Sequence, residues 1–246
     1  LWVTQDNGEQ FHIKHFQPQF GPALPSAETQ PGMGRRVFML HGEVESGRVY
    51  YDSQGKGLAW YLARQGYEVF VADLGGRGRS LLPEGDVSSL SVQQIIHSAI
   101  PKLLQSIANT PSHQGEETYF GCGADIWIGH GFGTVMLSAA WASMPDYLRT
   151  AQQMVFFSGR RRVSSRKKLP RLFMSLLGHP LMQKWVSRCN RFPAKKLGIG
   201  SANESVGWYV NYLNWMNSKK WLDEEGLDYA QNLLSHPLPP ILHLAT

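Results

Sequence analysis

A glycine-rich turn at residues 129–133 is the part of this sequence best placed to do chemistry. Its five residues are Gly129, His130, Gly131, Phe132 and Gly133. An apolar run at 126–128 typical of a buried strand precedes the turn, and an apolar run that predicts a helix follows it. Strand, sharp turn and helix with this glycine spacing match the pattern Gly-x-Ser-x-Gly, whose serine is an activated nucleophile. Position 131 is glycine, so the turn is predicted without its hydroxyl.

Four further stretches match one family pattern in their order and spacing. Residues 37–42 are similar to the strand and His-Gly turn that lead into an oxyanion loop, and residues 57–73 to the next helix and strand. Residues 76–80 are similar to the glycine-rich loop that follows, and residues 238–245 to a late core strand. Together with the turn, these stretches resemble the α/β-hydrolases of the lipase, esterase and peptidase kind.

The resemblance implies an α/β-hydrolase fold, with a mostly parallel sheet flanked by helices and a helical cap insertion. Continuous apolar runs such as 37–40 also suit central parallel strands buried on both faces. We expect a core at 1–159, a cap at 160–236 and a further core strand at 237–246. In the family order the acid follows that strand and the histidine comes later still, so both are expected beyond Thr246.

Two more elements are predicted from local pattern alone. Alternating residues at 11–16, preceded by a turn signal, predict a strand in a hairpin with residues 2–4. Apolar residues recur at the helical period over 92–107, and Ser91 with Gln94 resembles a capping box at the start. Pro101 predicts a kink or break in this helix.

The resemblance also implies site residues. The nucleophile position is Gly131, where a positive φ is expected, and the oxyanion donors are the amides of Phe132 and of Glu43 or Val44. The residues expected to support the elbow and its loop are His41, Gly42, Gly129, His130 and Gly133.

Other side chains near the turn are interpreted as structural. His41 is expected to orient its loop, and His130 to be a packed histidine that points away from the pocket. Asp73 is expected to be an exposed carboxylate at a strand end, and Ser138 a helix serine too far along the chain to replace the nucleophile.

Composition argues against several other classes of protein. The nine histidines show no metal-ligand spacing, and the glycines at 75–78 lack both the dinucleotide fingerprint and the Walker lysine. We therefore predict no metal site and no cofactor. No apolar run approaches the roughly 18 residues of a membrane span. Cys122 and Cys189 are interpreted as free thiols of a cytoplasmic protein, although a chain that begins at Leu1 is compatible with removal of an upstream segment.

The net charge of +5 conceals one strongly basic segment. Residues 160–196 contain twelve Lys or Arg and no Asp or Glu, whereas the rest of the chain has a net charge of −7. This segment is interpreted as a solvated face, as an attractor for an anionic ligand such as a phospholipid or phosphate-bearing acyl thioester, or as a contact with an anionic membrane. No nucleic-acid-binding motif accompanies it, so nucleic acid is not expected as a partner.

Two classes of function remain open. The first is hydrolysis of a carboxylic ester or similar acyl bond, which is the activity that the resemblance to serine hydrolases implies. The second is a non-catalytic small-molecule or lipid-binding protein on the same fold. Gly131 favours the second because no side chain can attack there, and it fits a natural loss and a replacement of serine equally well.

Overall fold

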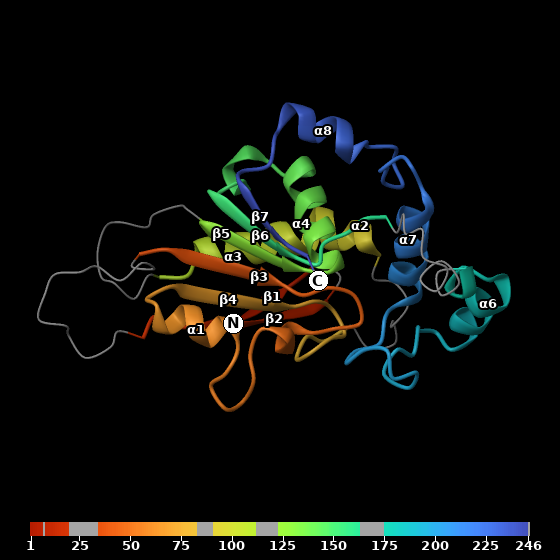
Figure 1. Ribbon diagram of the computed structural model, residues 1–246, viewed down its shortest axis with the longest axis horizontal. Helices are drawn as coiled ribbons and strands as arrows, with labels where there is room; N and C mark the ends of the chain where they lie inside the picture. The colour runs from red at the N-terminus through yellow and green to blue at the C-terminus, as the bar shows by residue number, and fades with distance from the viewer. Residues whose placement is uncertain (7, 20–33, 83–90, 112–122, 163–174, 246) are drawn as a thin grey trace, which may run out of the picture.

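A seven-stranded sheet forms the centre of the protein in the computed structural model (Figure 1). The structure describes residues 1–6, 8–19, 34–82, 91–111, 123–162 and 175–245. The strands lie in the order β1-β2-β4-β3-β5-β6-β7. Their bounds are β1 Trp2–Thr4, β2 Gln10–Phe16, β3 Arg36–Leu40, β4 Glu68–Asp73, β5 Ile126–His130, β6 Gln153–Phe157 and β7 Ile241–Leu244.

The strand directions confirm the mostly parallel sheet. β4, β3, β5, β6 and β7 run parallel to their neighbours, and only β1 and β2 introduce antiparallel pairs. The hairpin predicted at the N-terminus is present, with Val3 opposite Phe11. Every residue of β3 and β4 is buried, as expected for parallel strands covered on both faces.

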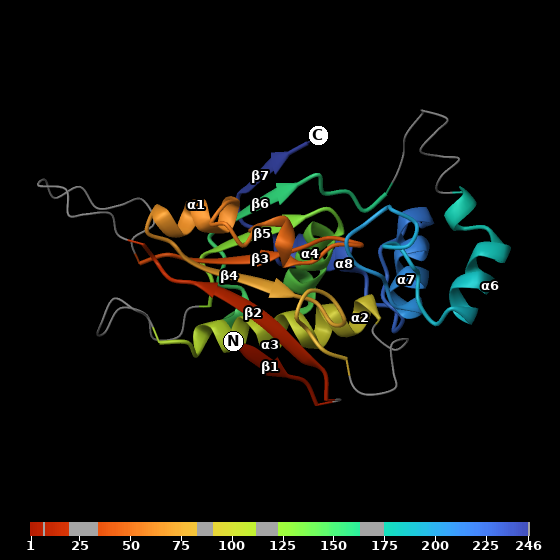
Figure 2. The ribbon, with the colours of Figure 1, turned by 90° about the horizontal axis from the view of Figure 1, so that it is seen from below.

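Helices cover both faces of the sheet (Figures 1 and 2). Helix α1 packs with one apolar cluster on one face, whereas α3, α4 and α8 contribute to a larger cluster on the other. The helical segments are η1 Gly47–Val49, α1 Leu58–Arg64, α2 Val92–Gln94, η2 Ile95–Ala99, α3 Ile100–Ala108, α4 Phe132–Ser143, η3 Asp146–Leu148, α6 Pro180–Arg188, α7 Val206–Asn217 and α8 Tyr229–Ser235.

The helical stretch 92–108 accommodates its proline by changing type. The capping box predicted at Ser91 and Gln94 is present. Just before Pro101 the chain forms a π-helix, in which the Ile100 amide bonds to the Ile95 carbonyl. Proline has no N–H and collides with the carbonyl four residues earlier, so a wider turn relieves both problems. The expected kink therefore takes the form of a local π-helix.

The turn between β5 and α4 requires glycine for steric reasons. A Cβ atom on Gly133 would lie 2.5 Å from the His41 carbonyl oxygen, and one on Gly129 would lie 2.9 Å from the Thr134 amide nitrogen. Any side chain at either position would push α4 away from β3 and β5. The glycine spacing therefore brings the first turn of α4 against the carboxyl ends of these strands.

The segment predicted as the cap contains elements with different partners. Around α6 and α7, a separate apolar cluster includes Val186, Phe192 and Tyr209. Helix α8 instead packs on α4, where the Asn232 side-chain amide donates to the Ala142 carbonyl at 3.3 Å. Helix α7 also packs on the main core, to which Trp208 and Trp215 contribute, so α7 and α8 both cover the core and α6 lies outside α7. Within the described residues, no helix is long and apolar enough to cross a membrane.

One cation of the basic segment has a structural role. The Arg161 guanidinium donates to the carbonyls of Trp215 and Ser218, both at 3.1 Å, at the end of α7. A positive charge at a helix C-terminus is favourable because the last carbonyls lack partners within the helix. Lys167 and Lys168 lie outside the described residues.

Candidate functional site

The predicted elbow is a sharp turn that joins β5 directly to α4. Gly131 has φ 52° and ψ −126° and immediately precedes α4. Its amide donates to the Phe157 carbonyl at 2.9 Å, which fixes the turn against the end of β6. The positive φ expected at this position is confirmed, and glycine adopts it without the steric penalty of a side chain.

A carboxylate from the neighbouring loop lies where the nucleophile would be. The Glu43 carboxylate accepts the Phe132 amide hydrogen at 2.7 Å. A Cβ atom on Gly131 would lie only 2.6 Å from the same Glu43 oxygen. The start of a helix favours negative charge because its first amides lack partners within the helix. Glu43 therefore satisfies the amide that the sequence assigned to an oxyanion.

The Val44 amide, one of the two alternatives for the second oxyanion donor, is also engaged. The Val44 amide donates to the Glu204 carboxylate, which comes from the cap side of the molecule. The Val44 carbonyl accepts from the Ala202 amide at 2.9 Å. Val44 has φ 51°, an unfavourable value for a β-branched residue, so these two bonds hold it in a strained conformation. The Val44 amide therefore already has a partner within the chain, and the Glu43 amide stays the other predicted alternative.

Arg77 connects Glu204 to the loop that follows β3. Its guanidinium donates to the Glu204 carboxylate and, at 3.2 Å, to the Gly42 carbonyl. Burial raises the pKa of the Glu204 carboxyl to about 7, against the opposing effects of the Arg77 charge and the Val44 amide. The cap and the predicted oxyanion loop are thus linked through one buried acidic side chain.

His41 is a neutral structural residue. Its Nδ1 donates to the Gly42 carbonyl at 2.9 Å, and its Nε2 accepts the Leu74 amide hydrogen at 3.0 Å. Burial, and then the Arg77 charge, lower the pKa of the His41 imidazole to about 3. With both ring nitrogens engaged, His41 holds the loop against the end of β4 and cannot act as a base at the elbow.

The structure corrects the interpretation of Asp73. Its carboxylate is buried rather than exposed and accepts from the Gly47 amide at 2.8 Å and the Arg79 amide at 3.0 Å. A Cβ atom on Gly78 would lie 2.1 Å from the same carboxyl group. Asp73 therefore organises the two loops that follow β3 and β4.

His130 also differs from its expected role. Rather than being packed, it is partly exposed, and its Nδ1 lies 2.8 Å from the Glu45 carboxylate. The hydrogen bond to Glu45 raises the pKa of the His130 imidazole. Glu45 also accepts from the Gly42 amide at 3.2 Å. His130 therefore belongs to a polar cluster beside the elbow.

Aromatic side chains of α7 cover the elbow. The Phe132 ring lies edge-on to Trp208, with centroids 5.5 Å apart, and to Tyr212, with centroids 4.9 Å apart. Burial, followed by the nearby charge of Glu43, raises the pKa of the Tyr212 hydroxyl, which is also hydrogen-bonded to that carboxylate. Ser138 is a helix serine whose hydroxyl donates to the Thr134 carbonyl.

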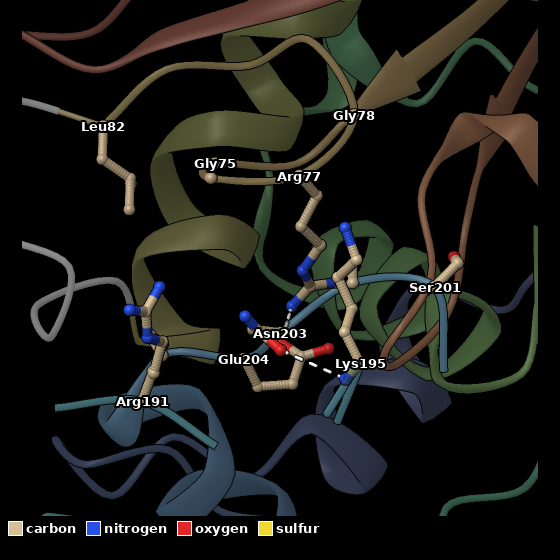
Figure 3. Close-up of a pocket in the computed structure, with 12 residues that line it drawn as sticks. Gly75, Arg77, Gly78, Leu82, Arg191, Lys195, Ser201, Asn203 and Glu204 are labelled. Carbon is tan, nitrogen blue, oxygen red and sulfur yellow. Dashed lines mark hydrogen bonds and ion pairs between the residues drawn. The ribbon is translucent and has the colours of Figure 1, made fainter. Parts of the chain in front are cut away.

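A separate cavity opens beside this network, between the loop after β4 and the cap (Figure 3). Its volume is about 250 Å³. Arg77 and Glu204 form part of its wall, which connects the cavity to the loop that carries Glu43. Sequence reasoning missed Glu204 and Tyr212 because cap insertions carry no shared motif. A lone acidic residue close to a strongly basic segment was the available signal for Glu204.

Known structures share this architecture. An esterase from Exiguobacterium antarcticum superposes with a TM-score of 0.56 at 13% identity, over 98% of this chain and 79% of the esterase. The α/β hydrolase GrgF from a Penicillium species gives a TM-score of 0.54 at 14% identity, over 100% of this chain and 88% of GrgF. No protein-family model matches the chain, and no curated protein matches it in sequence. The protein therefore has the α/β-hydrolase fold, whereas its chemistry has to be inferred from its own residues.

The overlap between Glu43 and a side chain at 131 predicts that these two positions are energetically coupled. Gly131→Ala should cost about 1–3 kcal/mol because of its left-handed φ, in addition to the cost of displacing the carboxylate. In a Glu43→Ala background the same change should cost at least about 1 kcal/mol less, because the obstacle is gone. Urea unfolding of the four proteins of this cycle measures the coupling.

Gly226→Ala is the matched control for this cycle. Gly226 has φ 91°, and a Cβ atom there would meet nothing within 4 Å. Its cost should add to that of Glu43→Ala to within about 0.5 kcal/mol. Additive costs for Gly131→Ala and Glu43→Ala would contradict the placement of the Glu43 carboxylate.

The His130–Glu45 pair predicts a pH dependence with a definite sign. Since the folded-state pKa of His130 is raised, its contribution to stability is present below the ordinary value of 6.5 and is lost as pH rises through the folded-state pKa. Glu45→Gln should lower the pKa of His130, which NMR titration of the imidazole measures. Glu43→Gln should lower it less, because Glu43 contributes only charge at a distance. An unchanged His130 titration in Glu45→Gln would contradict the pairing.

Proposed function

We propose that this protein is a non-catalytic small-molecule-binding member of the α/β-hydrolase fold. The observation that carries the proposal is the Glu43 carboxylate on the Phe132 amide, beside a residue 131 that has no side chain. Acyl hydrolysis by a serine mechanism requires a nucleophile and donors directed at a developing negative charge. Here Gly131 has no side chain that could act as a nucleophile, and the Glu43 carboxylate would repel a developing oxyanion.

The surroundings of the elbow support the same proposal. The Val44 amide is bonded to Glu204, and α7 closes over Phe132 with aromatic rings. These contacts engage the amides of Phe132 and Val44, two of the three amides named as oxyanion donors. The ligand class that we propose is an acyl-type or anionic small molecule, including lipid, and the basic cap is proposed to help attract it, or an anionic membrane surface, through its charge.

Hydrolysis of a carboxylic ester or similar acyl bond is the second candidate. It is favoured by the backbone of the elbow, since Gly131 has a positive φ and the Phe132 amide lies at the start of α4. This arrangement would direct a side chain at 131 toward the same amide once Glu43 had moved. The two functions differ in whether a hydroxyl at 131 restores turnover.

The binding proposal predicts no acyl-enzyme and no serine labelling. The unaltered protein should give no adduct with a fluorophosphonate, measured by intact mass, and no turnover above buffer on p-nitrophenyl esters, amides and thioesters. Even enzymes that have lost triad members retain about 10³–10⁴-fold rates over water through their oxyanion donors. Because the Glu43 carboxylate occupies the Phe132 amide here, we expect a rate enhancement below this residual level. A stoichiometric adduct, or turnover abolished by Glu43→Gln, would overturn the proposal.

The second candidate is tested by restoring the hydroxyl. Gly131→Ser with Glu43→Ala should be inactive under the binding proposal, also in a chain continued past Thr246. Hydrolysis by the Gly131→Ser/Glu43→Ala protein but not by the matched Gly131→Ala/Glu43→Ala protein would favour the hydrolase function, because the two variants differ by one oxygen atom.

A further inference from the structure

The cavity between the loop after β4 and the cap has walls of unusual composition. One wall is backbone, since Gly75, Gly76 and Gly78 line it without side chains. The opposite wall comes from residues 191–205 of the cap. Figure 3 shows Arg191 and Lys195 rising from the cap toward the glycine loop, and Arg77 extending from that loop toward them.

Two of the cations in this wall have no neutralising partner. Arg77 is paired with the buried Glu204 side chain and is therefore already engaged. In the part of the chain that the structure describes, neither the Arg191 guanidinium nor the Lys195 ammonium has an ion-pair partner. Among the described residues that line the cavity, Glu204 is the one acidic side chain, and its two carboxylate oxygens contact Val44 and Arg77. The described lining residues therefore carry excess positive charge.

The remaining lining residues suit an oxygen-rich anion. Ser201 and Asn203 add polar groups to the cap wall, and the Asn203 side-chain oxygen accepts the Lys195 amide hydrogen at 3.1 Å. This bond fixes the backbone from which the Lys195 side chain extends. The volume of about 250 Å³ lies below the roughly 300–1,000 Å³ of sites for drug-sized ligands. Such a space fits a small charged group rather than a long acyl chain.

We infer that this cavity binds the phosphoryl group of an anionic ligand between Arg191 and Lys195. A phosphoryl group offers several oxygens to separate cationic donors, and charge-assisted hydrogen bonds of this kind are stronger than neutral ones. The inference goes beyond the proposed function, because a phosphoryl site here would serve a binding protein or a hydrolase equally.

Calorimetric titration with glycerol 3-phosphate tests the site in solution. We expect saturable one-to-one binding that weakens as salt screens the exposed cations. Arg191→Gln and Lys195→Gln should each weaken it by about fivefold or more, because each removes a charge-assisted bond. Unchanged thermal unfolding of the unliganded variants establishes that they are folded.

Arg188→Gln and Lys196→Gln are matched controls. Each removes one exposed charge close in sequence to a lining residue, but neither residue lines the cavity. They should change the affinity by less than about twofold, since exposed charges that make no direct contact with the ligand are screened. Equal losses in all four variants would show diffuse attraction to the basic cap and overturn the inference, as would the absence of saturable binding.

Inorganic phosphate and vesicles distinguish the possible sources of the phosphoryl group. Binding of the soluble probes alone, lost in Arg191→Gln and Lys195→Gln, supports a free phosphate ester. Additional binding to phosphatidylcholine vesicles that contain phosphatidic acid supports a lipid headgroup, provided that Arg191→Gln and Lys195→Gln each weaken it. Vesicle binding without any soluble-probe binding, and equal in all four variants, would contradict a site in the cavity. None of these outcomes bears on labelling at the elbow, so failure here leaves the proposed function intact.

Discussion

The hydrogen bond from the Phe132 amide to the Glu43 carboxylate determines what the elbow can do. The amide belongs to the first turn of α4, where the helix leaves its donors unsatisfied and favours a negative charge. In a serine hydrolase such a donor is reserved for the charge that develops in the transition state. Here it already has a permanent anionic partner from the same chain. The absence of a side chain at Gly131 makes room for that carboxylate, so the two features support each other.

The position of Glu43 depends in turn on the buried network beneath the cap. Its neighbour Val44 is held on both sides, by the Glu204 carboxylate and the Ala202 amide. Glu204 is held by Arg77, which also donates to the carbonyl of Gly42 on the other side of Glu43. Buried ion pairs gain little over apolar packing, but removal of one partner costs about 3–5 kcal/mol because a charge is left unpaired. This network therefore specifies one loop conformation and joins it to the cap.

The same network connects the elbow with the cavity, because Arg77 and Glu204 contribute to both. The cavity and the elbow are therefore joined structurally, although different residues provide their distinctive groups. Glu43 and Tyr212 define the elbow, whereas Arg191 and Lys195 define the open side of the cavity.

The fold was predictable from sequence where the chain has few steric alternatives. Buried apolar runs located the strands, and the spacing of Gly129 and Gly133 implied a turn that only glycine can make. Side-chain partners were less predictable, because they depend on residues distant in sequence. Asp73 was expected at the surface, but two loops fold back over it, and Glu43 was identified for its amide rather than its carboxylate. Glu204 escaped notice because its partners, Val44 and Arg77, are far away in sequence and become neighbours only in the folded chain.

The Phe132 amide proton gives the most direct test of the central claim. A charge-assisted hydrogen bond to a carboxylate should shift its NMR resonance downfield. Glu43→Ala should move that resonance upfield, whereas Glu45→Ala should leave it close to its native position, because Glu45 is bonded to His130 and Gly42 instead. An unchanged Phe132 resonance in Glu43→Ala would show that the carboxylate does not occupy the elbow, and the account of a self-filled oxyanion site would be contradicted.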